Sequence, residues 1–269
     1  MKKLLTHIRP HLDDICAFWL LKRYLPEAQD AEIGFVATNA KGGDAHDDED
    51  TACVGVGRGK YDEHKGDVND CSTTLVWKDI LTKVQIDPSE RMAVQKIVDW
   101  AFLEDTGRLG AEARRSFAVP AIIEGYFDGH DRDSFAVTQF GFTLLDAVVT
   151  AQRNEVKIEN AWAARKEFVS RYGRAVAVIG DARGLDSYAY NRGFDLIAIM
   201  DGSGRYHTYR ANANTDIDLT PTRDLLAKID PTAEWYFHHS KKMLICGGDH
   251  SPNTPISKLT FDQFVEAIT

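Results

Sequence analysis

Two histidines and two carboxylates lie within eight residues near the start of the chain. His7 and His11 are separated by three residues, and Asp13 and Asp14 follow closely. Imidazole nitrogen and carboxylate oxygen together suit a borderline-to-hard divalent ion such as Mn²⁺, Fe²⁺ or Zn²⁺. The alternative is a polar loop in which Asp13 or Asp14 caps the helix that follows. The spacing predicts either a metal site or a helix cap here.

The elements around this segment decide where its side chains lie. An apolar run at residues 4–8 predicts a strand, and residues 15–21 predict a buried helix. The predicted ligands therefore follow the carboxyl end of a strand. In open α/β sheets, that edge is where ligands bind.

A second cluster, residues 54–65, combines a strand, a glycine-rich turn and the triplet Asp62-Glu63-His64, with Lys60 and Lys65 on either side. Ser72 then begins a predicted helix whose free amides can hold an anion. A third segment places Asp105 at a helix end, before Gly107 and Arg108. Taken singly, these residues have ordinary explanations: Asp105 could end a helix before a Gly107 cap, and Lys60 or Lys65 could be solvated surface charges.

The remaining pattern predicts an α/β protein of two domains with a boundary near residue 170. A polar loop at residues 42–50 separates two expected strands, which indicates a βαβ-type opening. The expected helices are 72–84, 87–104, 140–149 and 159–172, with further helices starting at Thr220 and Thr260. The expected strands are 31–38, 52–57, 175–179, 194–200, 205–209, 235–238 and 243–246.

Composition and net charge argue against membranes and duplex DNA as binding partners. The apolar stretches are too short to cross a bilayer and no secretory signal is evident, so we expect a cytoplasmic protein without a membrane partner. Cys16, Cys53, Cys71 and Cys246 show no paired spacing and are expected to be reduced thiols. The net charge of −9 argues against strong binding of duplex DNA, which needs many Lys and Arg contacts. A monomer and a dimer both remain open.

The order of these motifs resembles the DHH phosphoesterase superfamily, which includes RecJ-type nucleases, oligoribonucleases and manganese-dependent inorganic pyrophosphatases. The series is His7-x3-His11-x-Asp13, then a strand and Asp62-Glu63-His64, then Ser72 to Trp77, then Asp105-Thr106-Gly107. It is most similar to the Myg-type nucleases, over about residues 1–170. The resemblance implies a doubly wound parallel sheet in a catalytic domain at 1–170, a smaller mixed α/β substrate-binding domain at 171–269, and catalysis in the cleft between them.

The resemblance also implies roles for individual residues. His7, His11, Asp13, Glu63 and Asp105 would be metal ligands. The implied catalytic residues are His64 and Asp62. Mn²⁺ is the expected metal, with Mg²⁺, Fe²⁺ and Zn²⁺ as alternatives, and one or two ions are expected. A bound ion lowers the pKa of a water that attacks phosphorus.

Two positions depart from the family pattern. Glu63 stands where relatives place a ligating imidazole, and its oxygen still suits Mn²⁺ or Mg²⁺. Gly55 stands where relatives place the aspartate that bridges two metals. An acidic residue between Asp44 and Asp50 could substitute, the site could be mononuclear, or catalysis could be lost.

Substrate contacts are expected from two regions. Lys60, Lys65 and Arg108 are candidates near the triplet. In the second domain, residues 246–251 resemble the glycine-rich loop of DHH-associated domains, in which Gly247, Gly248 and His250 would approach a phosphate; a plain strand-to-loop turn is the alternative. The expected substrate is a short single-stranded oligonucleotide or a small phosphodiester.

Two other functions remain open. Pro10-His11-Leu12-Asp13-Asp14 also resembles the first motif of LmbE-like zinc N-deacetylases, with His130-Asp131 as a downstream ligand pair. Ile15 stands where that family has Glu, and the triplet and Asp105 are then unexplained. A binding protein with a degraded site is the third interpretation, because Gly55 and Glu63 depart from the pattern.

Overall fold

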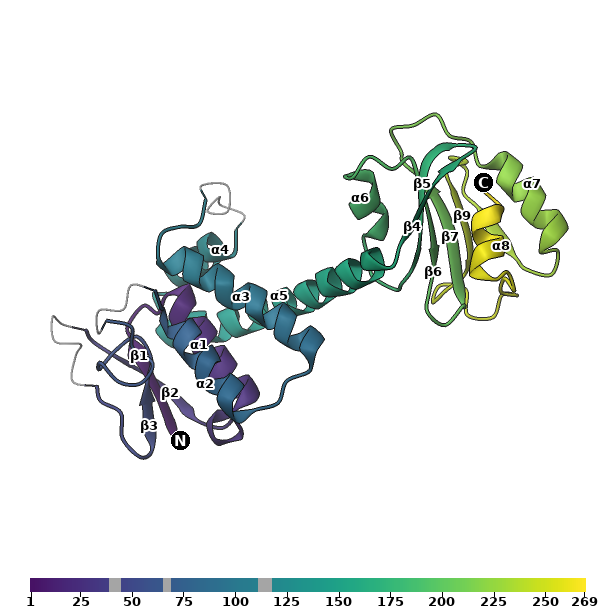
Figure 1. Cartoon of the computed structure of the whole chain (residues 1–269). Helices are drawn as coiled ribbons and strands as arrows, with labels where there is room; N and C mark the ends of the chain where they lie inside the picture. Colours follow the sequence, from purple (N-terminus) through teal and green to yellow (C-terminus); the bar gives the residue numbers. More distant parts are fainter. Residues whose placement is uncertain (39–44, 65–68, 111–117) are drawn as a thin grey trace. The chain divides into compact units, whose positions relative to one another are not determined.

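The chain consists of two compact units, each containing helices and a sheet (Figure 1). The computed structural model describes residues 1–38, 45–64, 69–110 and 118–269. Unit 1 is Met1–Arg153 and unit 2 is Asn154–Thr269. This division lies inside helix α5 (Ser134–Ala163), upstream of the composition change near residue 170. The α/β class predicted from the sequence is confirmed in both units.

Unit 1 contains a parallel sheet of three described strands in the order β2-β1-β3. The strands are β1 (Lys3–His7), β2 (Glu32–Val36) and β3 (Thr51–Cys53). The segment between β1 and β2 forms α1 (Leu12–Tyr24), which confirms the βαβ opening. Because β1 is central and ends at His7, that histidine leaves the sheet at its carboxyl edge.

Three helices of unit 1 pack side by side: α1, α2 (Ser72–Lys83) and α3 (Pro88–Asp105) (Figure 1). Every residue of α1 from Leu12 to Leu21 is buried, so α1 is a core helix. The helix α3 begins where the Asp87 side chain accepts hydrogen bonds from the amides of Ser89 and Glu90. The helix starts predicted at residues 72 and 87 are confirmed. A short helix, η1 (Pro26–Ala28), and α4 (Val119–Gly129) complete the unit with the first part of α5.

The first part of α5 packs closely against α1. A Cβ on Gly141 would lie 2.6 Å from the Ile15 side chain, so glycine permits this approach. Asp146 accepts hydrogen bonds from Trp19 Nε1 at 3.0 Å and Arg23 Nη1 at 2.9 Å. These contacts position α5 on the unit 1 core.

By length and composition alone, α5 also meets the criteria for a membrane-crossing helix. It is the one helix to do so in the described part of the chain, and 33% of its apolar window is buried. One such helix is weak evidence for a membrane, because core helices of soluble proteins meet the same criteria.

Unit 2 is built on a six-stranded sheet in the order β4-β5-β6-β7-β9-β8. Only the β5–β6 pair is parallel among the pairings described. The strands are β4 (Lys166–Ser170), β5 (Gly173–Ile179), β6 (Leu196–Met200), β7 (Tyr206–Ala211), β8 (Trp235–Phe237) and β9 (Met243–Gly247).

Helices cover both faces of this sheet. They are α6 (Leu185–Tyr190), α7 (Thr220–Ile229) and α8 (Phe261–Glu266). Ala175 and Ala177 pack with Leu226 of α7 and Phe264 of α8. The alternate residues of β5 pack on the other face, in a cluster with the end of α5 and with α6. Alternation along β5 therefore explains why nearly the whole strand is apolar.

Two sequence predictions of secondary structure are wrong in part. The helix expected at 159–172 ends at Ala163, and Lys166–Ser170 is strand β4, because it pairs antiparallel with β5. The strand expected at 52–57 is shorter, since β3 ends at Cys53 and the backbone turns at Gly55 and Gly57, where φ is 63° and 76°.

Candidate metal centre

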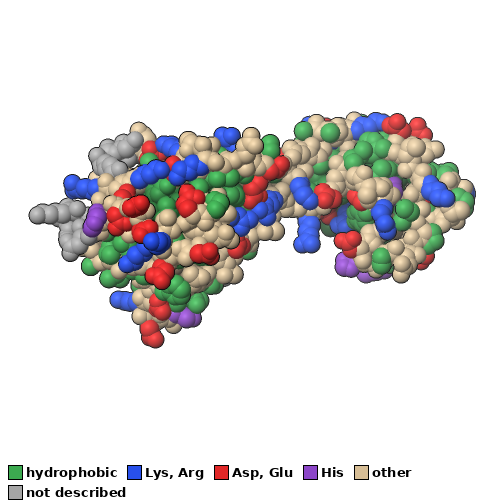
Figure 2. Space-filling model, turned by 90° about the horizontal axis from the view of Figure 1, so that it is seen from below, with side chains coloured by type: hydrophobic (Ala, Val, Ile, Leu, Met, Phe, Trp, Pro, Cys, Tyr) green, Lys and Arg blue, Asp and Glu red, His purple; other side chains and the backbone are tan. Residues whose placement is uncertain are grey.

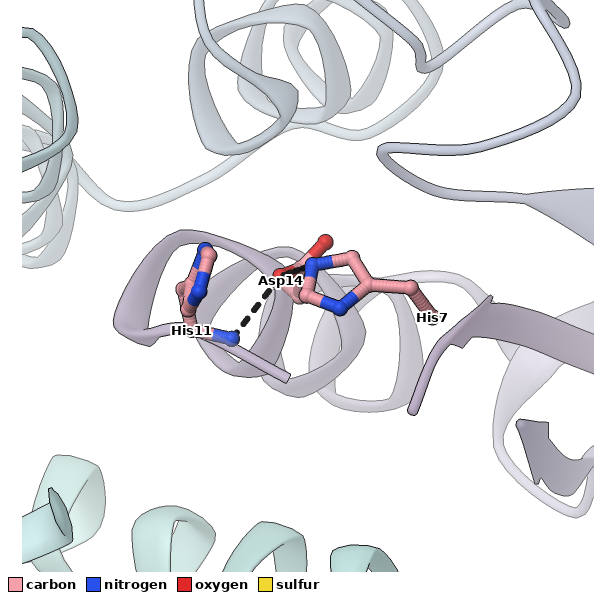
Figure 3. A group of neighbouring side chains, drawn as sticks. All are labelled: His7, His11 and Asp14. Atoms are coloured by element: carbon pink, nitrogen blue, oxygen red, sulfur yellow. Dashed lines mark hydrogen bonds and ion pairs between the residues drawn. The ribbon is translucent and has the colours of Figure 1, made fainter. Parts of the chain in front are cut away.

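The carboxylate of Asp14 joins the two predicted histidine ligands into one group (Figure 3). His7 Nε2 lies 2.9 Å from Asp14 Oδ2, which also accepts a hydrogen bond from the His11 amide at 2.9 Å. The hydroxyl of Thr6 donates to Asp14 Oδ1 at 2.9 Å. One ligand atom from each of His7, His11 and Asp14 lies within 4.8 Å of the others.

Asp14 belongs to the cluster of possible metal donors in the sequence, but the ligand roles implied by the resemblance did not include it. A signal was present, because His11 and Asp14 are three residues apart at a helix start and so share a face. In the structure Asp14 is buried and forms an ion pair with His7. Burial lowers the pKa of His7, but the hydrogen bond and charge of Asp14 outweigh it and raise that pKa to about 9. Burial raises the pKa of Asp14, and the contacts with His7 reverse this and lower it.

Asp13 faces the start of helix α2. Its carboxylate oxygens accept hydrogen bonds from the amides of Ser72 at 2.9 Å and Thr73 at 2.8 Å. The sequence analysis expected the amides at this helix start to be free for a substrate anion. That expectation is wrong for these two amides, because the buried Asp13 occupies them.

A second ligand group consists of Asp13, Glu63 and Asp105, again with one ligand atom per residue within 4.8 Å of the others. The Ser72 hydroxyl donates to Glu63 Oε2 at 2.8 Å. This group brings together the first motif, the triplet and the end of α3, as the resemblance implied.

The electrostatics of the second group fit a divalent cation. Burial and the charge of Asp14 raise the pKa of Asp13 to about 7, despite hydrogen bonds that lower it. Burial, Glu63 and Asp14 likewise raise the pKa of Asp105. Carboxylates held this close repel one another, and a bound cation would relieve the repulsion. Imidazole and carboxylate donors also match the ligands of Mn²⁺, Fe²⁺ or Zn²⁺.

His64 is exposed and is oriented by the buried Asp62. Asp62 Oδ1 lies 2.8 Å from His64 Nδ1 and accepts from the His64 amide at 3.0 Å. Asp62 Oδ2 accepts from the Arg58 amide at 2.6 Å. Burial lowers the pKa of His64, but the Asp62 hydrogen bond and the charge of Glu63 outweigh it and raise the pKa. With Nδ1 held by Asp62, His64 Nε2 is the nitrogen left for a substrate.

Gly55 leaves a space that Asp14 fills. A Cβ built on Gly55 would overlap Asp14 Oδ1, and the glycine has a φ of +63°. The acidic loop that could have replaced a missing aspartate is used otherwise: Asp47 accepts from the amides of Cys53 and Lys60, and Asp48 from those of Asp50 and Thr51. Asp44 lies outside the described residues.

The predicted substrate residues belong to both units. The Lys60 ammonium pairs with Asp79, Arg108 is exposed with its guanidinium 5.4 Å from the Phe102 ring centre, and Lys65 lies outside the described residues. In unit 2, Gly247 is the last residue of β9 and has a φ of +74°, and Gly248 follows it with a φ of +94°. His250 lies just beyond and is exposed. Their contribution to a shared site remains a prediction.

Comparison with known proteins finds a distant likeness among solved structures. No protein-family model and no curated protein matches this sequence. Among solved structures, the chain is similar to a DHH domain described as a member of the s1p family of ribosomal proteins. The identity is 12% and the TM-score 0.33, over 99% of this chain and 85% of that chain. That description names a DHH domain, the superfamily that the sequence motifs resemble.

Proposed function

We propose that this protein is a metal-dependent phosphoesterase of the DHH type, acting on short single-stranded oligonucleotides or small nucleotide-like phosphodiesters in the cytoplasm. The observation that carries the proposal is the convergence of two ligand groups at the carboxyl edge of the unit 1 sheet. Their members come from segments far apart in the sequence: His7, His11, Asp13, Asp14, Glu63 and Asp105.

Each residue has a role in this proposal. His7, His11 and Asp14 would hold one divalent ion, Mn²⁺ in our proposal, and the three carboxylates of the second group offer a place for another. The bound ion would supply Lewis acidity and lower the pKa of a water. His64 has a raised pKa, so it stays protonated over a wider pH range and can donate a hydrogen bond to a phosphate oxygen or a proton to the leaving group.

Metal analysis tests the ligand assignment. We expect Mn²⁺ to bind the wild-type protein and to be lost or much weakened in His11→Ala and in Asp105→Asn, whose side chains are exposed and can be changed without a core defect. The matched control is His130→Ala, another exposed histidine of unit 1. Elemental analysis after dialysis gives the stoichiometry. Unchanged metal content in both ligand variants contradicts the proposal.

Hydrolysis of bis-p-nitrophenyl phosphate tests the activity. We expect Mn²⁺-stimulated cleavage that falls by about 10²–10⁴-fold in His64→Ala, the range typical of a general acid or base. Circular dichroism of the variant should match the wild type, because His64 is exposed. Cleavage by His64→Ala at the wild-type rate would remove His64 from the mechanism.

The N-deacetylase alternative has less support from the geometry. His11 and Asp14 do share a ligand group, but His130 stacks on Tyr126 and neither His130 nor Asp131 belongs to a ligand group within the described ranges. Deacetylation of an N-acetyl sugar by a protein holding one Zn²⁺, without phosphodiester cleavage, would favour that function. A protein that binds no metal would favour the third interpretation, a binding protein with a degraded site.

A further inference from the structure

A cavity of about 240 Å³ with both polar and apolar lining residues borders the candidate metal centre inside unit 1. Its walls come from the start of α1, the end of α3, and helices α4 and α5. His11 and Asp105 line it at the metal side. The apolar part is formed by Leu12, Ile123 and Phe127, together with two prolines and a valine. None of the metal-ligand motifs predicted helix α4 or this cavity.

Arg9 is held beside this cavity in an uncommon backbone conformation. Its φ is +61°, in the left-handed region that favours glycine. The Arg9 amide donates to Ser134 Oγ at 3.0 Å, which ties the loop to the start of α5. The guanidinium lies 5.7 Å from the Phe127 ring centre. A planar cation and an aromatic ring thus lie together at one end of the cavity.

The charged and the apolar residues of the cavity favour different parts of a substrate. Glu104, Asp105 and Glu124 contribute three carboxylates to the lining, against the one guanidinium of Arg9, so a phosphate is favoured most where a bound cation would lie, at His11 and Asp105. The apolar walls favour an uncharged group. The volume lies below the usual range for drug-sized ligands, about 300–1,000 Å³, which suits a single ring system.

We propose that this cavity receives the base of a nucleoside phosphate whose phosphate lies against the metal-ligand groups. The inference rests on the proposed function and names the substrate class of that site. The base is positioned by the apolar walls and by Phe127 and Arg9, because aromatic rings and guanidinium groups stack on the faces of bases. The protein then prefers a nucleotide to a simple sugar phosphate because the base fits into the cavity, and not because side chains form hydrogen bonds with the base.

Binding of AMP and of ribose 5-phosphate to the Mn²⁺-loaded protein tests this, measured by isothermal titration. The two ligands share the phosphate and the sugar and differ by the base. We expect AMP to bind about 10-fold more tightly, within the range of base–aromatic stacking. Ile123→Trp would fill the cavity and remove that advantage. Ile122→Trp is the matched control, because Ile122 is the neighbouring residue on α4 but is 37% exposed, whereas Ile123 is 4% exposed.

A second variant guards against misfolding of Ile123→Trp. Phe127→Leu keeps an apolar side chain and removes the ring, so it should also reduce the preference for AMP. Equal binding of AMP and ribose 5-phosphate by the wild type overturns the proposal, as does a preference that survives in a folded Ile123→Trp protein.

The design separates this proposal from the proposed function. Mn²⁺ content is measured for every variant and should not change, since neither isoleucine is a ligand. A wild-type protein that binds no Mn²⁺ would count against the proposed phosphoesterase function and not against the cavity. The cavity is tested without metal by titrating adenosine into EDTA-treated protein, where binding by the wild type and Ile122→Trp but not by Ile123→Trp is expected. Failure of adenosine to bind the wild type overturns the cavity assignment alone.

Discussion

At the scale of single residues, Asp14 and Gly55 depend on each other. Asp14 is buried, pairs with His7, and lies where a side chain at position 55 would begin. A glycine with φ of +63° therefore both makes the turn after β3 and leaves room for the carboxylate. Asp14, in the first turn of α1, thus places a carboxylate oxygen where it would overlap a Cβ at position 55.

Gly55→Ala tests this dependence. We expect the free energy of unfolding to fall by about 1–3 kcal/mol, because alanine is strained at this φ and its Cβ displaces Asp14. Mn²⁺ affinity should fall with it. Urea denaturation and metal titration measure the two effects.

The control for that variant is Gly125→Ala in α4, where nothing lies within 4 Å of the added Cβ. Alanine in a helix interior should raise stability by about 0.5–1 kcal/mol and leave metal binding unchanged. A Gly55→Ala protein as stable and as rich in metal as the wild type would show that Asp14 does not need the glycine.

At the scale of elements, Asp13 joins α1 to α2 by accepting the first amides of α2. Its carboxylate therefore makes buried contacts between two helices, whereas the His11 side chain is exposed at the N-cap of α1. Removing the Asp13 side chain should therefore lower the free energy of unfolding more than removing the His11 side chain.

We expect His11→Ala to lose metal while the apo protein keeps its stability. Asp13→Ala should also lower the free energy of unfolding of the apo protein by about 1–3 kcal/mol, because two buried amides lose their acceptor. Thermal denaturation in EDTA separates the two variants. Equal melting temperatures would mean that the cap contributes nothing.

A different element, strand β7, carries a buried histidine that makes unit 2 sensitive to acid. His207 is 1% exposed, and neither ring nitrogen has a hydrogen-bond partner in the described chain. Burial lowers its pKa, although the charges of Asp201 and Asp230 oppose this. Below the ordinary histidine pKa of 6.5, the unfolded chain therefore takes up a proton that the folded chain resists, and stability falls as pH falls.

The change of stability between pH 7.5 and pH 5.5 measures this effect. The loss should be smaller in His207→Leu than in the wild type, because the variant lacks the buried imidazole whose pKa is lowered. His250→Gln, an exposed histidine of the same unit, should behave like the wild type. An unaltered pH dependence in His207→Leu would remove this residue as the cause.

At the scale of the whole molecule, charge restricts the substrates that the protein can hold. The chain has 41 acidic and 32 basic residues. On the face in view in Figure 2, basic side chains are interspersed with acidic ones over both units. Positive charge of this kind can contact a few phosphates but cannot follow a long polyanion.

Binding of single-stranded oligonucleotides should therefore depend weakly on salt. With two or three phosphates contacted, the slope of log K against log salt concentration is expected to be about −1.5 to −2. Fluorescence anisotropy from 50 to 300 mM NaCl measures it, with a duplex of the same length as the comparison. Tight duplex binding with a steep slope would contradict the expectation.

Local sequence patterns determined much of the fold. Apolar periodicity and capping residues located β1, α1, α2 and α3 because the information lies within a few residues of each helix or strand. Strand β4 was missed because residues 166–170 pair with β5, and pairing is not visible in the segment itself. His7, His11, Glu63 and Asp105 were named as ligands because their motifs resemble those of the DHH superfamily, and the structure places them in two groups.

Only the tertiary structure shows which residues each ligand side chain contacts. Asp13 and Asp14 are adjacent in the sequence, yet one faces the amides of α2 and the other faces His7, because successive helix residues point about 100° apart. The overlap of position 55 with Asp14, and the cavity between His11 and α4, involve segments 41 to more than 100 residues apart. Residue types indicated the chemistry of the site. The space that each side chain occupies and the residues that it contacts depend on packing between distant segments, which no local sequence pattern specifies.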